Sequence, residues 1–226
     1  MIWDDIGFLL SKNKYNENSI IAEIFTENHG KCSGIIFGAT SKKIKNYLQI
    51  GNKVHINQNI KTEGRIGYFK VEILKALTPM FFDNKEKLLC ISSAINLVKI
   101  LTVESQENQE IFNLIGKLFL ILSKDTWIKD YIFWELELLK LVGFNLELKK
   151  MVQFEIVNDQ KVYFVKSNNE KKNVPNFLVE NNQDKLTQSE LNKGFKLVSD
   201  YLEKNILKPN NINFPSSRLD FINILK

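Results

Sequence analysis

The sequence predicts an α+β protein. Short apolar segments with a period of two fill residues 2–77, and after Pro79 the apolar period changes to three and four. Two short apolar segments flank a polar turn within about 150–185 and interrupt the helical pattern. We therefore expect a β-domain at residues 1–78, followed by a helical domain at 79–226 that carries a β-hairpin insertion at about 150–185.

Five segments of the N-terminal part have strand character. The alternation is clearest where Val54 and Ile56 face away from polar neighbours, and where Phe69 and Val71 do the same. The predicted strands are residues 6–10, 19–26, 32–37, 52–61 and 66–77. Five strands in under 80 residues predict a small closed sheet, and an OB-fold barrel is the natural match in size. A lysine-rich loop would then join strands three and four.

The middle of the chain predicts a helical bundle. Apolar residues recur at three and four over residues 84–143, which indicates three helices. Asn108 and Asp125 lie near two predicted helix starts, and Gly143 is a predicted C-terminal stop. The third helix is apolar around most of its circumference, so we expect it at the centre of the bundle.

The last part of the chain predicts a hairpin, a polar insertion and two more helices. Phe154–Val157 and Val162–Val165 flank a polar turn and predict the hairpin. Thr187 and Glu190 form a capping-box pattern that begins a helix running to Leu207. The predicted mobile polar tracts are residues 166–173 and 180–185, and the terminal helix is residues 214–225.

The basic residues concentrate in the first third of the chain. Residues 1–78 carry 11 basic and 7 acidic side chains, a net charge of +4, whereas the remainder carries 20 and 19. A polyanionic partner and plain solubility explain such an excess about equally well. Only Arg65 and Arg218 are arginines. Since lysine contacts phosphate as a point charge, we expect any nucleic-acid binding to be largely independent of sequence.

The sequence contains no catalytic constellation. Ser41 occupies the position where a phosphate-binding loop needs a glycine directly before its lysine. His29 and His55 have no second metal ligand at a useful spacing, and His29 is interpreted as a turn residue. A Cys32–His29 nucleophile pair is disfavoured against a small buried cysteine. We therefore expect no enzymatic activity, no metal and no cofactor.

The sequence also favours a cytoplasmic location. Cys32 and Cys90 form no CxxC pair, so neither a disulfide framework nor a thiolate zinc site is indicated. Asp4 and Asp5 stand where a signal peptide needs positive charge. No apolar segment approaches the roughly 20 residues that span a bilayer, so we expect no membrane association.

A surface for polyanions is the chemistry that the sequence supports. Ser41 is predicted to cap a short helical turn that begins the lysine cluster and whose free amides also favour an anion. Tyr68 alternates away from the apolar face of its strand and is the best candidate for stacking on a base. The candidate DNA-binding residues are Lys12, Lys14, Lys31, Lys42, Lys43, Lys45, Arg65, Tyr68 and Lys70.

The N-terminal motifs resemble those of the RecO family of bacterial recombination mediators. The pattern is Trp-x-Asp-x-Gly-x-(Val/Leu)-Leu, Thr-x-x-His-Gly, Gly-x-x-Ser-basic-basic and Leu-Gln-x-Gly-Asn. It lies here at Trp3, Asp5, Gly7, Leu9, Leu10, Thr26, His29, Gly30, Gly38, Ser41, Lys42, Lys43, Leu48, Gln49, Gly51 and Asn52. The segment WELELLKLVGF at 134–144 is similar to a helical segment of the same family.

The resemblance implies an OB-fold followed by a helical bundle with a zinc-ribbon-like insertion. It further implies a DNA repair and recombination protein that binds single- and double-stranded DNA and anneals complementary strands. With RecR, such a protein helps to load RecA onto single strands coated by SSB, without hydrolysing a nucleotide. The implied partners are DNA, RecR and the SSB C-terminal tail, and the implied location is the nucleoid.

The resemblance also implies a zinc site that this sequence does not support. Many family members hold zinc through four cysteines in the insertion, but residues 146–186 contain none. We therefore expect a degenerate, metal-free hairpin held by packing. The candidates for that packing are Phe154, Val157, Tyr163 and Phe164.

Two other functions remain open from the sequence. The chain could be a protein-interaction scaffold that docks the SSB tail, with DNA binding secondary. It could also be an OB-fold RNA-binding protein, although the large helical part argues against this alternative.

Overall fold

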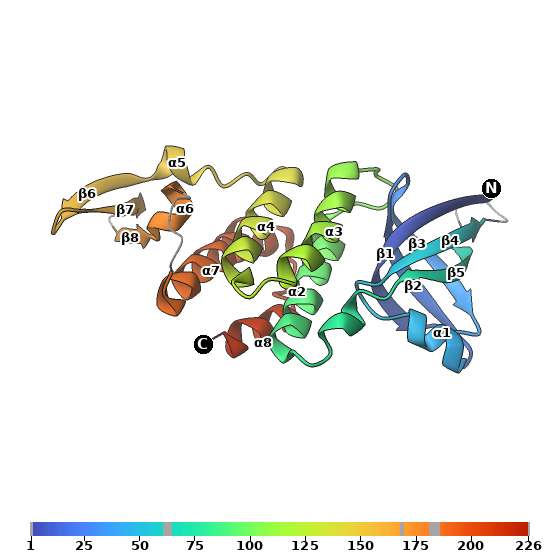
Figure 1. Cartoon of the computed structure of the whole chain (residues 1–226). Helices are drawn as coiled ribbons and strands as arrows, with labels where there is room; N and C mark the ends of the chain where they lie inside the picture. The colour runs from blue at the N-terminus through green and yellow to red at the C-terminus, as the bar shows by residue number, and fades with distance from the viewer. Residues whose placement is uncertain (1, 61–64, 168–169, 181–185, 226) are drawn as a thin grey trace. The chain divides into compact units, whose positions relative to one another are not determined.

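The computed structural model describes residues 2–60, 65–167, 170–180 and 186–225 (Figure 1). The chain forms two compact units: residues 1–124 with 215–225, and residues 125–214. The predicted boundary after residue 78 lies inside the first unit, at the step from strands to helices.

Five strands close a barrel in the order β1-β2-β3-β5-β4, drawn in blue tones in Figure 1. They are β1 (Ile2–Lys14), β2 (Ser19–Thr26), β3 (Gly30–Phe37), β4 (Lys53–Asn59) and β5 (Gly67–Lys75). Neighbouring strands are antiparallel except β3 and β5, which pair in parallel. The predictions of five strands and of a closed sheet are confirmed.

The barrel core comes from the alternation in the sequence. Leu9, Ile24, Val54, Ile56 and Phe69 are buried together inside it. Burying this apolar face is the main contribution that holds the barrel closed.

Strand β1 is longer than the predicted segment 6–10. Its first half pairs with β4 and its second half with β2, so its polar ends also have strand neighbours. These ends, Trp3–Asp5 and Ser11–Lys14, carry too few apolar residues to show a strand in the sequence alone.

The loop predicted between β3 and β4 contains helix α1 (Lys42–Tyr47). Ser41 is its N-cap, and the Ser41 hydroxyl accepts a hydrogen bond from the Ile44 amide at 3.4 Å. The predicted cap is therefore confirmed.

Helices complete the first unit. They are the 3₁₀ turn Thr78–Phe81, α2 (Lys85–Leu101), α3 (Gln109–Leu122) and α8 (Ser216–Ile224). Asn84 and Asn108 cap α2 and α3, which confirms the predicted start at Asn108. Helix α8 contacts α2, and Asn96 donates to the Ser217 hydroxyl at 3.1 Å.

The second unit is built on α4 (Trp127–Leu141) and α7 (Gln188–Leu202). Tyr131 and Trp134 of α4 are almost fully buried, as expected for its central position.

The capping box of Thr187 and Glu190 is present, but α7 ends at Leu202 and continues as a π-helical turn to Leu207. Asp125 lies near the start of α4, as predicted, and the N-cap is the next residue, Thr126, which makes no side-chain cap bond. The short helices α5 (Leu148–Met151) and α6 (Asn176–Glu180) were not predicted.

The insertion is a three-stranded sheet in the order β6-β7-β8. Its strands are β6 (Gln153–Val157), β7 (Gln160–Ser167) and β8 (Glu170–Val174). Asn158 and Asp159 both have positive φ, which is the two-residue turn that the twist of a hairpin favours. The prediction of a mobile tract at 166–173 is wrong for residues 166–167 and 170–173, which pair in β7 and β8, and residues 168–169 lie outside the described residues. Of the second predicted tract, residues 181–185 lie outside the described residues.

Only part of the predicted hairpin packing is found. Tyr163 and Phe164 are buried, and the Tyr163 hydroxyl donates to Glu180 of α6 at 2.5 Å. Phe154 and Val157 are 56% and 45% exposed, so they contribute less burial, although the Phe154 ring lies against that of Tyr163 with centroids 6.1 Å apart. They lie on β6, a strand at the edge of the sheet whose residues are all exposed.

Candidate nucleic-acid interface

Helix α1 brings lysines together with the end of β1. The Lys12 ammonium donates to the carbonyl of Leu48, the C-cap residue of α1, at 2.5 Å. Partial burial, together with the charge of Lys45, lowers the pKa of Lys12 below its ordinary value. Lys14 and Lys42 are exposed on the same two elements. Lys12, Lys14, Lys42 and Lys45 form what we call the lysine surface.

Lys43 follows Lys42 in α1, but its side chain lies outside the described part of the chain. Its backbone belongs to the helix.

An aromatic pair lies on β3 and β5. The rings of Phe37 and Tyr68 are stacked with centroids 5.1 Å apart, and Phe37 is 56% exposed. Tyr68 is half-buried, and Lys70 two residues further along β5 is exposed. Helix α1 contacts β5, the strand that carries Tyr68 and Lys70.

Lys31 has a structural position, and its assignment to the DNA-binding set is corrected. It is only 8% exposed, and its ammonium donates to the carbonyls of Lys99 and Thr102 at 2.8 and 2.5 Å. These carbonyls end helix α2, whose C-terminus favours a cation. Burial lowers the pKa of Lys31 despite the nearby carboxylates of Glu23 and Glu104. No pattern in the sequence distinguishes it from the exposed lysines.

Arg65 lies in a different place from the lysine surface. It is exposed and lines a cleft of about 750 Å³ together with Trp3, His29, Ser33 and Glu104. Trp3 and Lys12 are nine residues apart on β1, about 30 Å along an extended strand. The barrel therefore presents two separate regions, the lysine surface and this cleft, which we call the Trp3 cleft.

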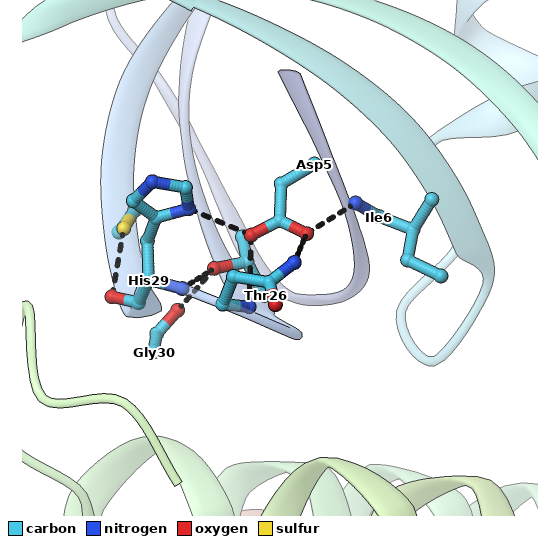
Figure 2. Close-up of polar contacts among 7 residues, drawn as sticks. Asp5, Ile6, Thr26, His29 and Gly30 are labelled. Carbon is cyan, nitrogen blue, oxygen red and sulfur yellow. Dashed lines mark hydrogen bonds and ion pairs between the residues drawn. The ribbon is translucent and has the colours of Figure 1, made fainter. Parts of the chain in front are cut away.

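A buried carboxylate organises one wall of the Trp3 cleft (Figure 2). Asp5 Oδ2 lies 2.7 Å from His29 Nδ1, and Asp5 accepts hydrogen bonds from the Asn28 amide and side chain and from the Ile6 amide. Burial raises the pKa of Asp5, but the bonds from His29, Asn28 and Ile6 outweigh it and hold the pKa below its ordinary value.

The turn that carries His29 is fixed by its own side chains. Thr26 accepts from the His29 amide at 3.1 Å, and the Thr26 hydroxyl donates to the Gly30 carbonyl at 3.0 Å (Figure 2). Gly30 has a φ of 66°, which favours glycine. The interpretation of His29 as a turn residue is confirmed, but its contact with Asp5 was not foreseen, because 24 residues separate them.

Cys32 has the environment of an inert thiol. Its Sγ donates to the His29 carbonyl at 3.4 Å, and burial raises its pKa to about 11. Since the thiolate is the nucleophile, the interpretation of Cys32 as a small buried residue is confirmed.

The chain does not provide the zinc ligands that the resemblance implies. Its two cysteines, Cys32 and Cys90, are buried in the first unit, and its two histidines belong to the barrel. The β6-β7-β8 sheet therefore has neither a thiolate nor an imidazole to offer a metal. Among the described residues, no group of three His, Cys, Asp or Glu side chains could hold a metal ion.

The second unit contains a groove of about 630 Å³. Its apolar lining includes Leu148, Val162, Val165 and Leu197. Its charged lining has more lysines than carboxylates. The lysines are Lys161, Lys172, Lys193, Lys196 and Lys204, and the carboxylates are Glu190 and Asp200. We call this the lysine-lined groove.

Over the ranges that the structure describes, none of the helices combines the length and apolar character needed to cross a bilayer.

One solved structure shows weak similarity to this chain. Asparaginyl-tRNA synthetase of Entamoeba histolytica aligns over 95% of this chain and 60% of its own, with 10% identity and a TM-score of 0.29. That score supports no conclusion about fold or function.

Comparison with known sequences identifies the family. Residues 1–77 match the model described as recombination protein O N terminal, and residues 84–211 match recombination protein O C terminal. The chain is 37% identical over 142 residues to DNA repair protein RecO of Rickettsia canadensis, covering 63% of this chain and 58% of that one. It is 35% identical over 163 residues to DNA repair protein RecO of Rickettsia felis, covering 72% and 68%. The match thus spans about three fifths to two thirds of these relatives, and the chain belongs to the RecO family.

Proposed function

We propose that this protein is a non-enzymatic mediator of DNA repair and homologous recombination that binds single- and double-stranded DNA and anneals complementary strands. With RecR, it would help to load RecA onto single strands coated by SSB. The names of the relatives support the repair role. RecR and SSB are proposed as partners from the family resemblance alone.

The barrel supports an OB-fold assignment. Five strands in the order β1-β2-β3-β5-β4 close through the β1–β4 pairing, with α1 inserted between β3 and β4. This fold binds single strands with a cationic groove and exposed aromatic rings. Phe37 and Tyr68 provide a ring pair on β3 and β5.

The convergence of Lys12 with helix α1 is the observation that carries the proposal. The Lys12 ammonium reaches the C-cap carbonyl of α1, so β1 and α1 present their lysines on one surface, and a phosphate backbone is the kind of ligand that such a surface would bind. Annealing fits such a surface, because neutralising two strands reduces their repulsion and leaves the base edges free to pair.

Strand annealing across a salt series tests the proposal. Wild-type affinity for single strands should fall with salt, with a log–log slope of about −0.7 for each lysine–phosphate contact. Replacing Lys42, Lys43 and Lys45 with Glu should abolish annealing. The matched control replaces the exposed Lys85, Lys117 and Lys149 with Glu, which changes the net charge equally away from α1. Equal loss in both triple variants would show that only net charge matters and would refute the lysine surface.

The lysine-lined groove favours a second role, docking of the SSB tail. An acidic peptide with apolar residues would match its lysines and its apolar lining. Replacing Lys193 and Lys196 with Glu should weaken binding of an SSB tail peptide while annealing of bare strands persists. If only this role exists, the Lys42, Lys43 and Lys45 variant should anneal normally.

A further inference from the structure

The Trp3 cleft is a built site that the proposed annealing surface does not use. It lies within the first unit and is lined by the start of β1, the β2–β3 turn, the start of β5 and the segment between α2 and α3. That segment is tied to the barrel, because the Ser105 amide donates to the Lys31 carbonyl at 2.9 Å. The cleft walls therefore come from elements that are fixed to one another.

One wall is a flat aromatic stack. The Trp3 indole and the His29 ring are nearly parallel, with centroids 3.8 Å apart and an angle of 7° between them. Trp3 packs against the barrel core, whereas the His29 side chain is 38% exposed. Asp5 holds the ring through Nδ1, as Figure 2 shows. A ring that is already fixed is a good stacking surface, because little side-chain freedom is lost when a base lies on it.

The remaining lining offers charges of both signs. Glu104 and Glu107 provide carboxylates, and the Ser33 hydroxyl donates to one oxygen of Glu104 at 2.7 Å. A carboxylate can accept further hydrogen bonds after the first one. Arg65 provides the cation on the same cleft. The ligand that fits is planar, has hydrogen-bond donors at one edge and carries an anionic group.

We propose that the Trp3 cleft binds one unpaired nucleotide whose base carries an exocyclic amino group, with the base on His29, the amino group on Glu104 and the phosphate at Arg65. Carboxylates accept readily from the N4 amino group of cytosine, so cytosine is a natural ligand. The inference rests on the proposed function to the extent that a DNA strand supplies the nucleotide. The lysine surface would then hold phosphates without regard to sequence, and the cleft would add a base preference.

Tryptophan side-chain NMR on the full chain tests this proposal. The protein has three tryptophans, and Trp127 and Trp134 are buried in the second unit, so they serve as internal controls. The probes are dCMP, dUMP and deoxyribose 5-phosphate, because dCMP and dUMP differ at the amino position and the sugar phosphate has no base. The oligonucleotides (dC)12 and (dU)12 form the second arm and show whether a free nucleotide or a strand is the source.

The expected result is a shift of the Trp3 signal by dCMP or (dC)12, with a Kd about tenfold lower than for the uracil counterpart. Glu104→Leu should remove that preference, because leucine has no oxygen to accept a hydrogen bond from the amino group, and the matched Glu110→Leu should keep it. Equal effects of cytosine and uracil, a preference that survives Glu104→Leu, or no shift at Trp3 with any probe would overturn the proposal.

A lysine variant separates this proposal from the proposed function. Replacing Lys42 and Lys45 with Glu should abolish annealing but keep the Trp3 shift by dCMP. If the wild-type protein fails to anneal and dCMP still shifts Trp3, the annealing function fails and the cleft assignment stands. If annealing follows the lysines and Trp3 never shifts, the cleft assignment alone fails.

Discussion

The ammonium of Lys31 lies 2.5 Å from the carbonyl oxygen of Thr102, the residue that caps the C-terminus of helix α2. The same group also contacts the Lys99 carbonyl, so one side chain of the barrel closes the last turn of this helix. Glu23 of β2 adds a second link through Lys99 at 2.8 Å. These contacts explain why α2 belongs to the same compact unit as the strands.

Lys31→Met should therefore lower the stability of the first unit and leave DNA affinity almost unchanged. Methionine keeps much of the apolar stem but leaves the α2 carbonyls without their cation, at a cost of about 1–3 kcal/mol. Urea unfolding measures the stability, and the salt-dependent binding of a single strand measures the affinity. Lys42→Met is the matched variant and should show the opposite result. A loss of affinity in Lys31→Met with unchanged stability would contradict this assignment.

Asp5 makes the stability of the barrel sensitive to acid. Because its folded pKa lies below the unfolded value near 3.8, its carboxylate contributes stability that is fully present above the unfolded pKa. That contribution is lost as the pH falls through the folded pKa. Asp5→Asn should thus lower the unfolding free energy by about 1–3 kcal/mol at pH 7.

The pH profile distinguishes this effect from a general loss of packing. Below about pH 4, Asp5→Asn should lose stability less steeply than the wild type, because it no longer carries the shifted carboxylate. Burial raises the pKa of Glu23, but its bonds to Lys99 and Ser11 outweigh burial and hold the pKa below its ordinary value. Some acid sensitivity should therefore remain in Asp5→Asn. Glu17→Gln, at an exposed position, is the control and should follow the wild-type profile. Parallel profiles for the wild type and Asp5→Asn would disprove the role of Asp5.

Gly30 should tolerate no side chain. Its φ of 66° is strained for alanine, and an added Cβ would overlap the backbone carbonyl of Gln106. Gly30→Ala should lower the unfolding free energy by about 3 kcal/mol, since the backbone on both sides must move. Gly38→Ala is a close control with a φ of 65° and its nearest atom 4.0 Å away, so it should lose only about 1 kcal/mol. If thermal or urea unfolding shows that Gly30→Ala and Gly38→Ala lose similar stability, the close approach of the Gln106 backbone to Gly30 does not cause the loss.

The sequence predicts those helices and strands whose apolar residues recur with a regular period along the chain. Val54, Ile56 and Phe69 alternate with polar residues, and each proved to be buried in the barrel. Strand β8 was missed because the polar segment Glu170–Val174 is a strand only through its pairing with β7. Local pattern contains no signal for such a partner.

The candidate site was predictable only where sequence neighbours are also spatial neighbours. Ser41, Lys42 and Lys45 follow one another, so their helix could be foreseen. The stack of His29 on Trp3 and the burial of Lys31 depend on contacts between distant residues. The Trp-x-Asp and Thr-x-x-His-Gly motifs pointed to these positions through the family resemblance, and the structure supplies the physical reason for them.

Cys32 should resist alkylation in the folded protein. Burial raises the pKa of Cys32 from 9.0 to about 11, so its thiolate fraction near neutral pH is about 100-fold below that of an unperturbed cysteine thiol. Cys90 is fully buried, so iodoacetamide should modify neither cysteine at pH 7.5 until urea unfolds the chain. A Lys14→Cys variant places a third thiol at an exposed position and should react at once in the same folded sample. Rapid modification of the folded wild type would mean that the first unit opens locally, because a thiol with this environment reacts only after its strand has separated from the barrel.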